Sequence, residues 1–287
     1  MNSRNFFHLL NCTVLLIISC SFFQKPNLTI SPNNWTGEQF TFAELDDLYK
    51  KKYSFNKTWS KLHKKRFRPY FKFLDKDYYI VGTYETFKED FLIIENEKGI
   101  RYKMKFDTNH YEKNNLPSYF LFKNVKEDAK SMIGNIIWLN NTFDSKGFFT
   151  YTDYNFTRFE PVKIIDIFSY QNRNYDYPIW LKIISFSGYE GYVRYNGEEG
   201  RVGIQDHYYL TDPLPELWGN DIIKKILNKK IELGMTDRQV RISIGNPDKL
   251  NITSSRHGIS KQWIYTDLNG NDIYYQFEYG KLIYINQ

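Results

Sequence analysis

The pattern of apolar positions is clearest near the C-terminal end of the chain. Two stretches, 221–227 and 237–244, repeat apolar residues at the spacing of a helix with one buried face. The second stretch also has start and stop signals. Thr236 and Gln239 have the spacing of a capping box, and Gly245 lets the chain leave the helix. The pattern predicts two consecutive helices.

Strand patterns follow the second helix. Strand signals lie at 251–255, 262–266, 273–277 and 281–285. Asn269-Gly270, between the second and third runs, is typical of a tight hairpin turn, because both residues tolerate positive φ angles. Residues 213–287 are therefore predicted to form one domain of two helices and an antiparallel sheet.

The middle of the chain carries further strand patterns. Between residues 131 and 212, apolar runs are separated by polar turns, at 136–139, 162–167, 180–184 and 191–195. Several short strands at this spacing predict a small β-rich barrel.

The region from residue 39 to 130 mixes both kinds of pattern. Thr41 and Glu44 have the spacing of another capping box, and Phe42, Leu45 and Leu48 share one helical face, which predicts a helix of about a dozen residues. Strands are expected at 78–81, 91–94, 100–106 and 119–122, and a short helix or turn at 124–131. We assign this region to no family. The whole chain is expected to be multi-domain, of the α+β class and mostly antiparallel β.

The first residues have the features of a secretory leader. Arg4 precedes an apolar run that is too short to cross a bilayer, since a spanning helix needs about 20 apolar residues. The run closes on IISC at 17–20, which resembles the lipobox of bacterial lipoproteins. The resemblance implies a signal peptide at 1–19, cleavage before Cys20 and a lipid on the Cys20 thiol. The alternatives are an ordinary signal peptide that contains a cysteine, and an uncleaved membrane anchor.

Lipidation of Cys20 would attach the mature chain to a membrane of the cell envelope and would modify its one remaining thiol. Cys12 and Cys20 are the only cysteines, so the mature chain would have neither a disulfide nor a free thiol. Prolines, asparagines and serines without periodicity predict a flexible tether at 20–38. Ser21 is not acidic, and in lipoproteins of this kind an acidic residue there marks retention in the inner membrane. The expected location is the cell envelope, with lipid anchorage in the outer membrane.

The net charge of +6 is unevenly distributed. Between Lys50 and Lys72 the chain has ten Lys and Arg residues and no acid, interleaved with aromatic residues. A lipid-anchored block of this kind can lie on anionic head groups, at about 1 kcal/mol per cation near the surface. The candidate lipid contacts are Lys57, Lys61, Lys64, Lys65, Arg66 and Arg68. The alternative is a solvated basic face with its aromatic rings in the core. Nucleic acid is not an expected partner for an envelope protein.

Part of the middle region resembles a bacterial SH3-type domain. The matching runs are WLKI at 180–183 and SGYEGYV at 187–193, within about residues 157–212. The resemblance implies binding of peptides, including those of the cell wall. Tyr189 lies on the turn and is the candidate ligand contact, whereas Trp180 is expected in the core.

Residues 217–287 resemble the small outer-membrane lipoprotein family BamE/SmpA. The matching runs, in order, are GMTDRQV at 234–240, GNP at 245–247, QWIY at 262–265 and GKL at 280–282. The resemblance implies two helices packed on a sheet of three or four strands, which binds partner proteins and anionic lipid. In the family the lipidated cysteine directly precedes this domain, whereas about two hundred residues separate the two here. This departure weakens the implied link to outer-membrane assembly.

The sequence has no recognisable catalytic constellation. The histidines of the mature chain, His63, His110, His207 and His257, are far apart and lack metal-ligand spacing. There is no nucleophile elbow and no phosphate-binding glycine loop. We therefore expect a protein that is not an enzyme and needs neither a metal nor a cofactor.

Three functions follow in order of preference. The first is a lipid-anchored envelope protein that binds an unidentified envelope protein through residues 213–287. The second is peptidoglycan binding through the barrel. The third is hydrolysis of an envelope polymer, because carboxylates distant in sequence can meet in space.

Overall fold

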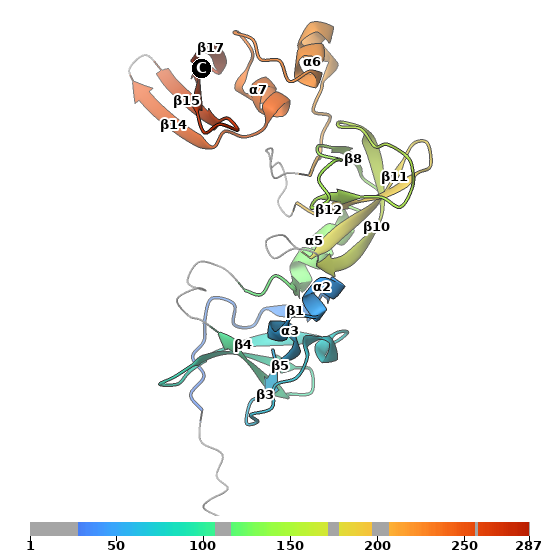
Figure 1. Ribbon diagram of the computed structural model, residues 1–287, viewed down its shortest axis with the longest axis vertical. Coiled ribbons are helices and arrows are strands. Elements are labelled where there is room, and N and C mark those ends of the chain that lie inside the picture. Colours follow the sequence, from blue (N-terminus) through green and yellow to red (C-terminus); the bar gives the residue numbers. More distant parts are fainter. Residues whose placement is uncertain (1–27, 107–115, 172–177, 197–206, 256–257, 287) are drawn as a thin grey trace, which may run out of the picture. The chain divides into compact units, whose positions relative to one another are not determined.

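The computed structural model describes residues 28–106, 116–171, 178–196, 207–255 and 258–286 (Figure 1). These residues form two compact units. The first takes the described residues up to Phe42 and from Asp46 to Pro117, and the second takes Ala43–Leu45 and the described residues from Ser118 onward. Both contain antiparallel strands and short helices, which confirms the predicted class in its coarse form. The predicted signal peptide and Cys20 lie outside the described residues.

The first unit is built on an antiparallel sheet. Its strands lie in the order β3 (Ser60–Lys61), β6 (Arg101–Phe106), β5 (Asp90–Asn96), β4 (Tyr78–Glu85) and β1 (Gln39–Phe42). Two single-turn helices, α2 (Asp47–Lys50) and α3 (Tyr53–Asn56), and the 3-10 turn η1 (Tyr70–Phe73) complete the unit. The predicted strands at 78–81, 91–94 and 100–106 are confirmed.

The helix predicted from Thr41 is wrong. Residues Gln39–Phe42 form strand β1, and the first helix begins only at Asp47, with Asp46 as its cap. The reason is burial with a period of two, because Phe40 and Phe42 are both buried and lie in the core of the sheet. Leu48, which the helical face would have buried, is 72% exposed.

The core of the first unit is mainly aromatic on one face of its sheet. The Phe42 ring lies 5.1 Å from that of Tyr78 and 5.5 Å from that of Trp59. Phe73 adds a ring 5.2 Å from Tyr102 of β6. A second cluster consists of Leu62, Phe91 and Ile93, with partly buried neighbours around it.

The tether predicted at 20–38 is contradicted for its described part. Ser31 pairs with Thr83 of β4, each N–H donating to the carbonyl of the other at 2.8 Å. Leu28 and Ile30 pack against the second cluster of the first unit. Residues 28–38 therefore belong to the folded unit, because their apolar side chains complete a core that the sheet alone leaves open.

The second unit begins with a curled sheet in the middle of the chain. Its strands lie in the order β13 (Tyr208–Tyr209), β8 (Ile136–Leu139), β10 (Pro161–Gln171), β11 (Ile179–Ser185), β12 (Glu190–Arg194) and β9 (Phe148–Phe149). The short strand β2 (Glu44–Leu45) runs parallel to the end of β10. The strands predicted between 131 and 212 are confirmed.

The boundary between the units differs from the one predicted at residue 130. Strand β7 (Phe120–Phe122) and helix α5 (Lys123–Ser131) follow the boundary and belong to the second unit. Leu121 and Ala129 are buried in one core with Ile137, Leu181 and Val193 of the curled sheet. Their apolar contacts, rather than their place in the sequence, assign them to this unit.

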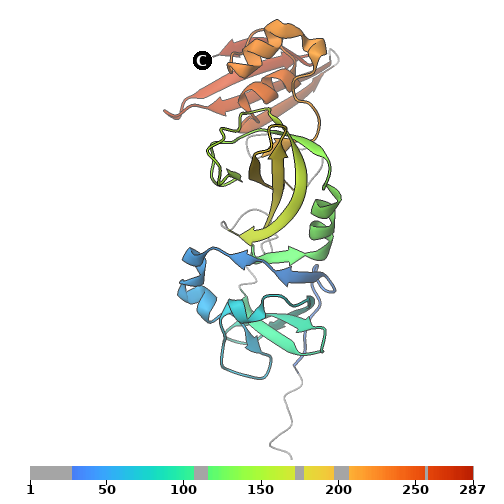
Figure 2. The same cartoon turned by 90° about the vertical axis from the view of Figure 1, so that its right-hand side faces the viewer.

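The C-terminal part of the second unit matches the predicted order of elements. The 3-10 turn η2 (Glu216–Trp218) and helices α6 (Gly219–Leu227) and α7 (Asp237–Ile244) precede an antiparallel meander of β14 (Lys249–Ser255), β15 (Gly258–Thr266), β16 (Asp272–Glu278) and β17 (Lys281–Asn286). The capping box at Thr236 is formed, and Gly245 ends α7 with φ 94°. In Figure 2 the two orange helices lie over one face of this sheet, where Val240 and Trp263 share a core.

The middle sheet and the C-terminal part also share a core within the second unit. Phe159 and Tyr209 of the middle region are buried with Ile226 of α6 and Ile242 of α7. The separate domain predicted for 213–287 is therefore packed against its neighbour.

Candidate functional site

The six candidate lipid contacts are all exposed. Lys64, Lys65 and Arg66 lie on the turn that follows β3. Lys61 pairs with Tyr102 across β3 and β6, which places it on the opposite face from its strand neighbour Ser60. The aromatic residues interleaved with these cations behave differently, since Trp59 and Tyr70 are fully buried. These two rings are thus structural, whereas Phe71 of the same block is 48% exposed.

Tyr189 lies at the tip of the hairpin between β11 and β12, as predicted, and is 44% exposed. Its ring stacks on Tyr154, with centroids 4.4 Å apart and planes 9° apart. The Tyr154 hydroxyl donates to Glu160 at 3.0 Å, and this bond is the main cause that raises the pKa of Tyr154. Tyr189 is therefore one member of an ordered aromatic pair.

A larger group of rings covers the outer side of the same sheet. Its members, which we call the aromatic surface, are Phe149, Tyr151, Phe168, Tyr170 and Tyr192. Phe149 and Tyr192 are cross-strand neighbours and stack at 4.6 Å. The outermost rings are those of Tyr151, 86% exposed, and Phe168, 45% exposed. Large exposed aromatic patches on a folded protein mark interaction sites.

The aromatic surface rests on a fixed support. Trp180 is fully buried beneath it, donates its indole N–H to the Tyr170 carbonyl at 3.1 Å and meets Phe149 at 4.8 Å. The Arg194 guanidinium lies 4.3 Å over the Trp180 ring and is itself fully buried. Arg194 Nε donates to the Lys146 carbonyl at 2.9 Å. A cation held between a ring and a carbonyl keeps the rings above it in one arrangement.

Charged groups border the aromatic surface. Lys182 is the cross-strand neighbour of Tyr192, and its ammonium lies 2.8 Å from Glu190. This hydrogen bond is the main cause that raises the pKa of Lys182. Asp166 lies across from Lys182 on β10. Flat rings with a few polar groups at their border can hold a ligand by its apolar faces and orient it by hydrogen bonds.

The sequence interpretation named Tyr189 and did not recognise the aromatic surface. Tyr189 precedes β12 and stacks on Tyr154, whereas Tyr192 lies within β12 and stacks on Phe149. The signal that would have found the surface is the spacing of Phe168 and Tyr170 on the polar side of β10. The strand order β10-β11-β12-β9, which adds Tyr192 and Phe149 to the same surface, is not visible in the sequence.

The C-terminal sheet has one unusual edge. Strand β14 lies at the end of the sheet, and Leu250 and Ile252 on it are 47% and 59% exposed. Their cross-strand neighbours are Trp263 and Lys261, so both apolar side chains point to the face that the helices cover. The helices leave this part of the face open.

No three His, Cys, Asp or Glu side chains among the residues described gather as a metal site would require. No helix in the described ranges is long and apolar enough to span a bilayer. Comparisons with protein-family models, with curated proteins and with solved structures give no match to this chain.

Proposed function

We propose that the protein is a lipid-anchored, non-catalytic binding protein of the bacterial envelope, and that its aromatic surface binds peptidoglycan. The observation that carries the proposal is the aromatic surface itself, with exposed Tyr151 and Phe168 above the buried Trp180 and Arg194. The lipobox-like sequence that ends at Cys20 supports the location. The resemblance of 180–193 to the SH3-type family supports a cell-wall ligand.

The physical argument is preorganisation. Aromatic faces carry partial negative charge and attract the C–H groups on the apolar faces of sugar rings and peptide side chains. Rings that already stack in the free protein lose little conformational freedom on binding. Lys182, Glu190 and Asp166 at the border offer charged partners for the carboxylate and amine groups of cell-wall peptides.

The test is sedimentation of the unlipidated chain, residues 21–287, with purified peptidoglycan sacculi. We expect the wild type to sediment and the double variant Tyr151→Ala/Phe168→Ala to bind at least about tenfold more weakly, because exposed aromatic anchors dominate such interfaces. The matched control is Phe87→Ala/Tyr284→Ala, which removes the same two ring types at exposed positions elsewhere. Tyr189→Ala, measured in parallel, separates the aromatic surface from the hairpin tip.

Absence of wild-type sedimentation at low salt, with the fold intact by circular dichroism, would overturn the proposal. An equal loss in the control pair would do the same, because it would assign the binding to nonspecific contact with exposed rings.

A second function, protein binding by the C-terminal part, is favoured by the open edge at β14. An edge strand with exposed Leu250 and Ile252 is suited to pair with an extended segment of a partner. The resemblance of 217–287 to the BamE/SmpA family points in the same direction.

The test of this second function is cross-linking in cells followed by isolation of the complexes. Removing residues 217–287 would uncover the buried Phe159 and Tyr209, so substitutions are the better probe. We expect Leu250→Lys/Ile252→Lys to lose a cross-linked protein that Ile283→Lys, at the other edge of the sheet, retains. Unchanged cross-links in the double variant would rule out β14 as the contact.

A further inference from the structure

The sheet of the first unit has a second face, and its strand register gathers cations there. Arg101, Lys103 and Lys105 alternate along β6 and therefore point to one side of the sheet. Tyr102, which lies between the first two, points to the other side, into the aromatic core. The three cations are cross-strand neighbours of Glu95, Ile93 and Phe91 in β5.

The turn after β3 brings three more cations to the same side. Leu62 and Phe67, at the two ends of the turn, pack with Phe91 and Ile93. The residues between them include Lys64, Lys65 and Arg66, all exposed. We call these three, with Arg101, Lys103 and Lys105, the basic face.

The arrangement keeps the positive charges close together. The Lys103 ammonium lies 4.9 Å over the ring of Phe91. Burial is the largest cause that lowers the pKa of Lys103, while the Glu89 carboxylate raises it and the charge of Lys65 lowers it. The contribution of Lys65 agrees with the packing of Leu62 and Phe67, which places the turn beside this face of the strand.

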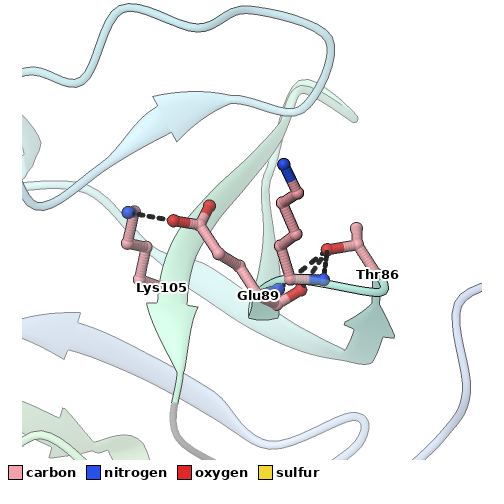
Figure 3. Close-up of polar contacts among 4 residues, drawn as sticks. Thr86, Glu89 and Lys105 are labelled. Atoms are coloured by element: carbon pink, nitrogen blue, oxygen red, sulfur yellow. Dashed lines mark hydrogen bonds and ion pairs between the residues drawn. The ribbon is translucent and has the colours of Figure 1, made fainter.

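Two carboxylates pair with members of the basic face. Arg101 Nε lies 2.6 Å from Glu95, and Lys105 is ion-paired with Glu89. Figure 3 shows that Thr86 holds Glu89 at the hairpin between β4 and β5, where the Glu89 N–H donates to the Thr86 hydroxyl at 2.9 Å. These two ion pairs involve only two of the six cations of the basic face. Its net charge is therefore positive.

The chain enters the first unit on this same side. Leu28 and Ile30 pack on the cluster that contains Phe91 and Ile93. Cys20 precedes Leu28 by eight residues, which span at most about 28 Å at 3.3–3.6 Å per residue. A lipid on Cys20 would therefore keep this side of the unit close to the membrane.

We propose that the basic face is a docking surface for an anionic membrane, in contact with the phosphate groups of the bilayer that would hold the lipid on Cys20. The orientation rests on the proposed lipid anchor, but the binding itself does not require the lipid. Of the six cations that the sequence singled out, the structure assigns this role to Lys64, Lys65 and Arg66. It adds Arg101, Lys103 and Lys105, which lie outside the sequence block.

The experiment measures binding of the unlipidated chain, residues 21–287, to vesicles of phosphatidylcholine alone and with phosphatidylglycerol. We expect binding only to the anionic vesicles, and weaker binding as salt rises from 0.05 to about 0.3 M, because screening shortens the range of these charges. The triple variant Lys64→Gln/Lys65→Gln/Arg66→Gln should bind roughly 100-fold more weakly, at about fivefold per cation.

The matched control is Lys123→Gln/Lys130→Gln/Lys224→Gln, which removes three exposed cations of the second unit and makes the same change in net charge. Its binding should stay within about fivefold of the wild type, the value of one cation. Equal binding to both vesicle types, no binding to anionic vesicles at low salt, or an equal loss in the control would overturn the proposal. Unfolding midpoints of both variants check the fold, and Lys65→Gln alone serves if the triple variant is unstable.

The lipid anchor is tested separately. Incorporation of labelled palmitate into the full chain, and its loss in Cys20→Ser, reports on lipidation whatever the vesicles show. Failure of the anchor and failure of the basic face are therefore distinguishable.

Discussion

Gly82 of β4 lies against the N-terminal segment, which runs alongside this strand. Its φ is 143°, and a Cβ built there would lie 2.2 Å from the Ser31 carbonyl oxygen. Ser31 is also the residue that pairs with Thr83 through two backbone hydrogen bonds. A side chain at Gly82 would therefore separate the segment from the sheet.

We expect Gly82→Ala to lower the free energy of unfolding of the first unit by more than about 3 kcal/mol. Backbone strain alone costs about 1–3 kcal/mol, and the clash with Ser31 adds to it. It should also make residues 28–38 more susceptible to proteolysis. Gly99→Ala is the matched control, because Gly99 has φ 70° but nothing within 4 Å of an added Cβ. If both variants lose the same stability in urea unfolding, the close approach of Ser31 has no energetic role.

Single side chains of the candidate site were only partly predictable. Burial of Trp180 is confirmed, although it lies under the aromatic surface rather than inside the curled sheet. Exposure of Tyr189 is also confirmed. The buried Arg194 was not anticipated, because an arginine in a sequence is usually at the surface and its contacts with Trp180 and Lys146 join distant segments.

At the scale of elements, prediction succeeded where local signals and burial agreed. The helix from Asp237 to Ile244 has both a capping box and a glycine stop, and the structure forms both. The capping-box spacing at Thr41 predicted a helix where the structure has a strand. The free energy of one helix cap is small beside that of burying Phe40 and Phe42 in the core of the sheet. Local spacing cannot reveal which face of a segment the rest of the chain covers.

The hairpin between β15 and β16 depends on one carboxylate. Asp267 accepts hydrogen bonds from the backbone N–H groups of Asn269 and Asn271, both at 2.8 Å. The bond from Asn271 is the largest cause that lowers the pKa of Asp267. A lowered pKa adds stability that is present above the unfolded value, about 3.9, and is lost as the pH falls through the folded value.

We expect Asp267→Asn to keep the shape of the turn but lose the charge. The melting temperature of the wild type should exceed that of the variant at pH 6, and the difference should disappear towards pH 2–3, below the ordinary aspartate pKa of about 3.9. Asp272→Asn, at the first residue of β16, is the control, because its carboxylate accepts a hydrogen bond from the Thr266 hydroxyl rather than from the turn backbone. A difference in melting temperature that is independent of pH would contradict the electrostatic account.

At the scale of the whole molecule, the sequence predicted the order of regions better than their boundaries. The strands of the middle region and the C-terminal meander were located from turn signals and alternation. The limits at 38, 130 and 212 were predicted from local sequence patterns, whereas the folded limits follow shared cores. Ile30, Leu121 and Phe159 each pack with residues beyond the predicted limit.

Arg158 connects the middle region to helix α7 within the second unit. Its Nη1 donates to the Ser243 carbonyl at 3.1 Å and its Nη2 to the Ile242 carbonyl at 2.6 Å. Its Nε donates to Asn140 Oδ1 at 3.1 Å. These carbonyls belong to the last turn of α7, where a cation is favoured by the helix dipole.

We expect Arg158→Ala to destabilise α7 relative to the middle sheet, by about 1.5–3 kcal/mol for each charged hydrogen bond lost. Hydrogen exchange in mild urea is the measurement, because it reports the opening free energy of each element. In the wild type, amides of α7 and β11 should open together, whereas in the variant α7 should open first. Arg238→Ala is the control, since it removes one arginine from α7 itself, at an exposed position over Trp218 that makes no contact with the end of the helix. If α7 and β11 still open together in Arg158→Ala, the apolar core of Phe159, Tyr209, Ile226 and Ile242 alone couples the two parts.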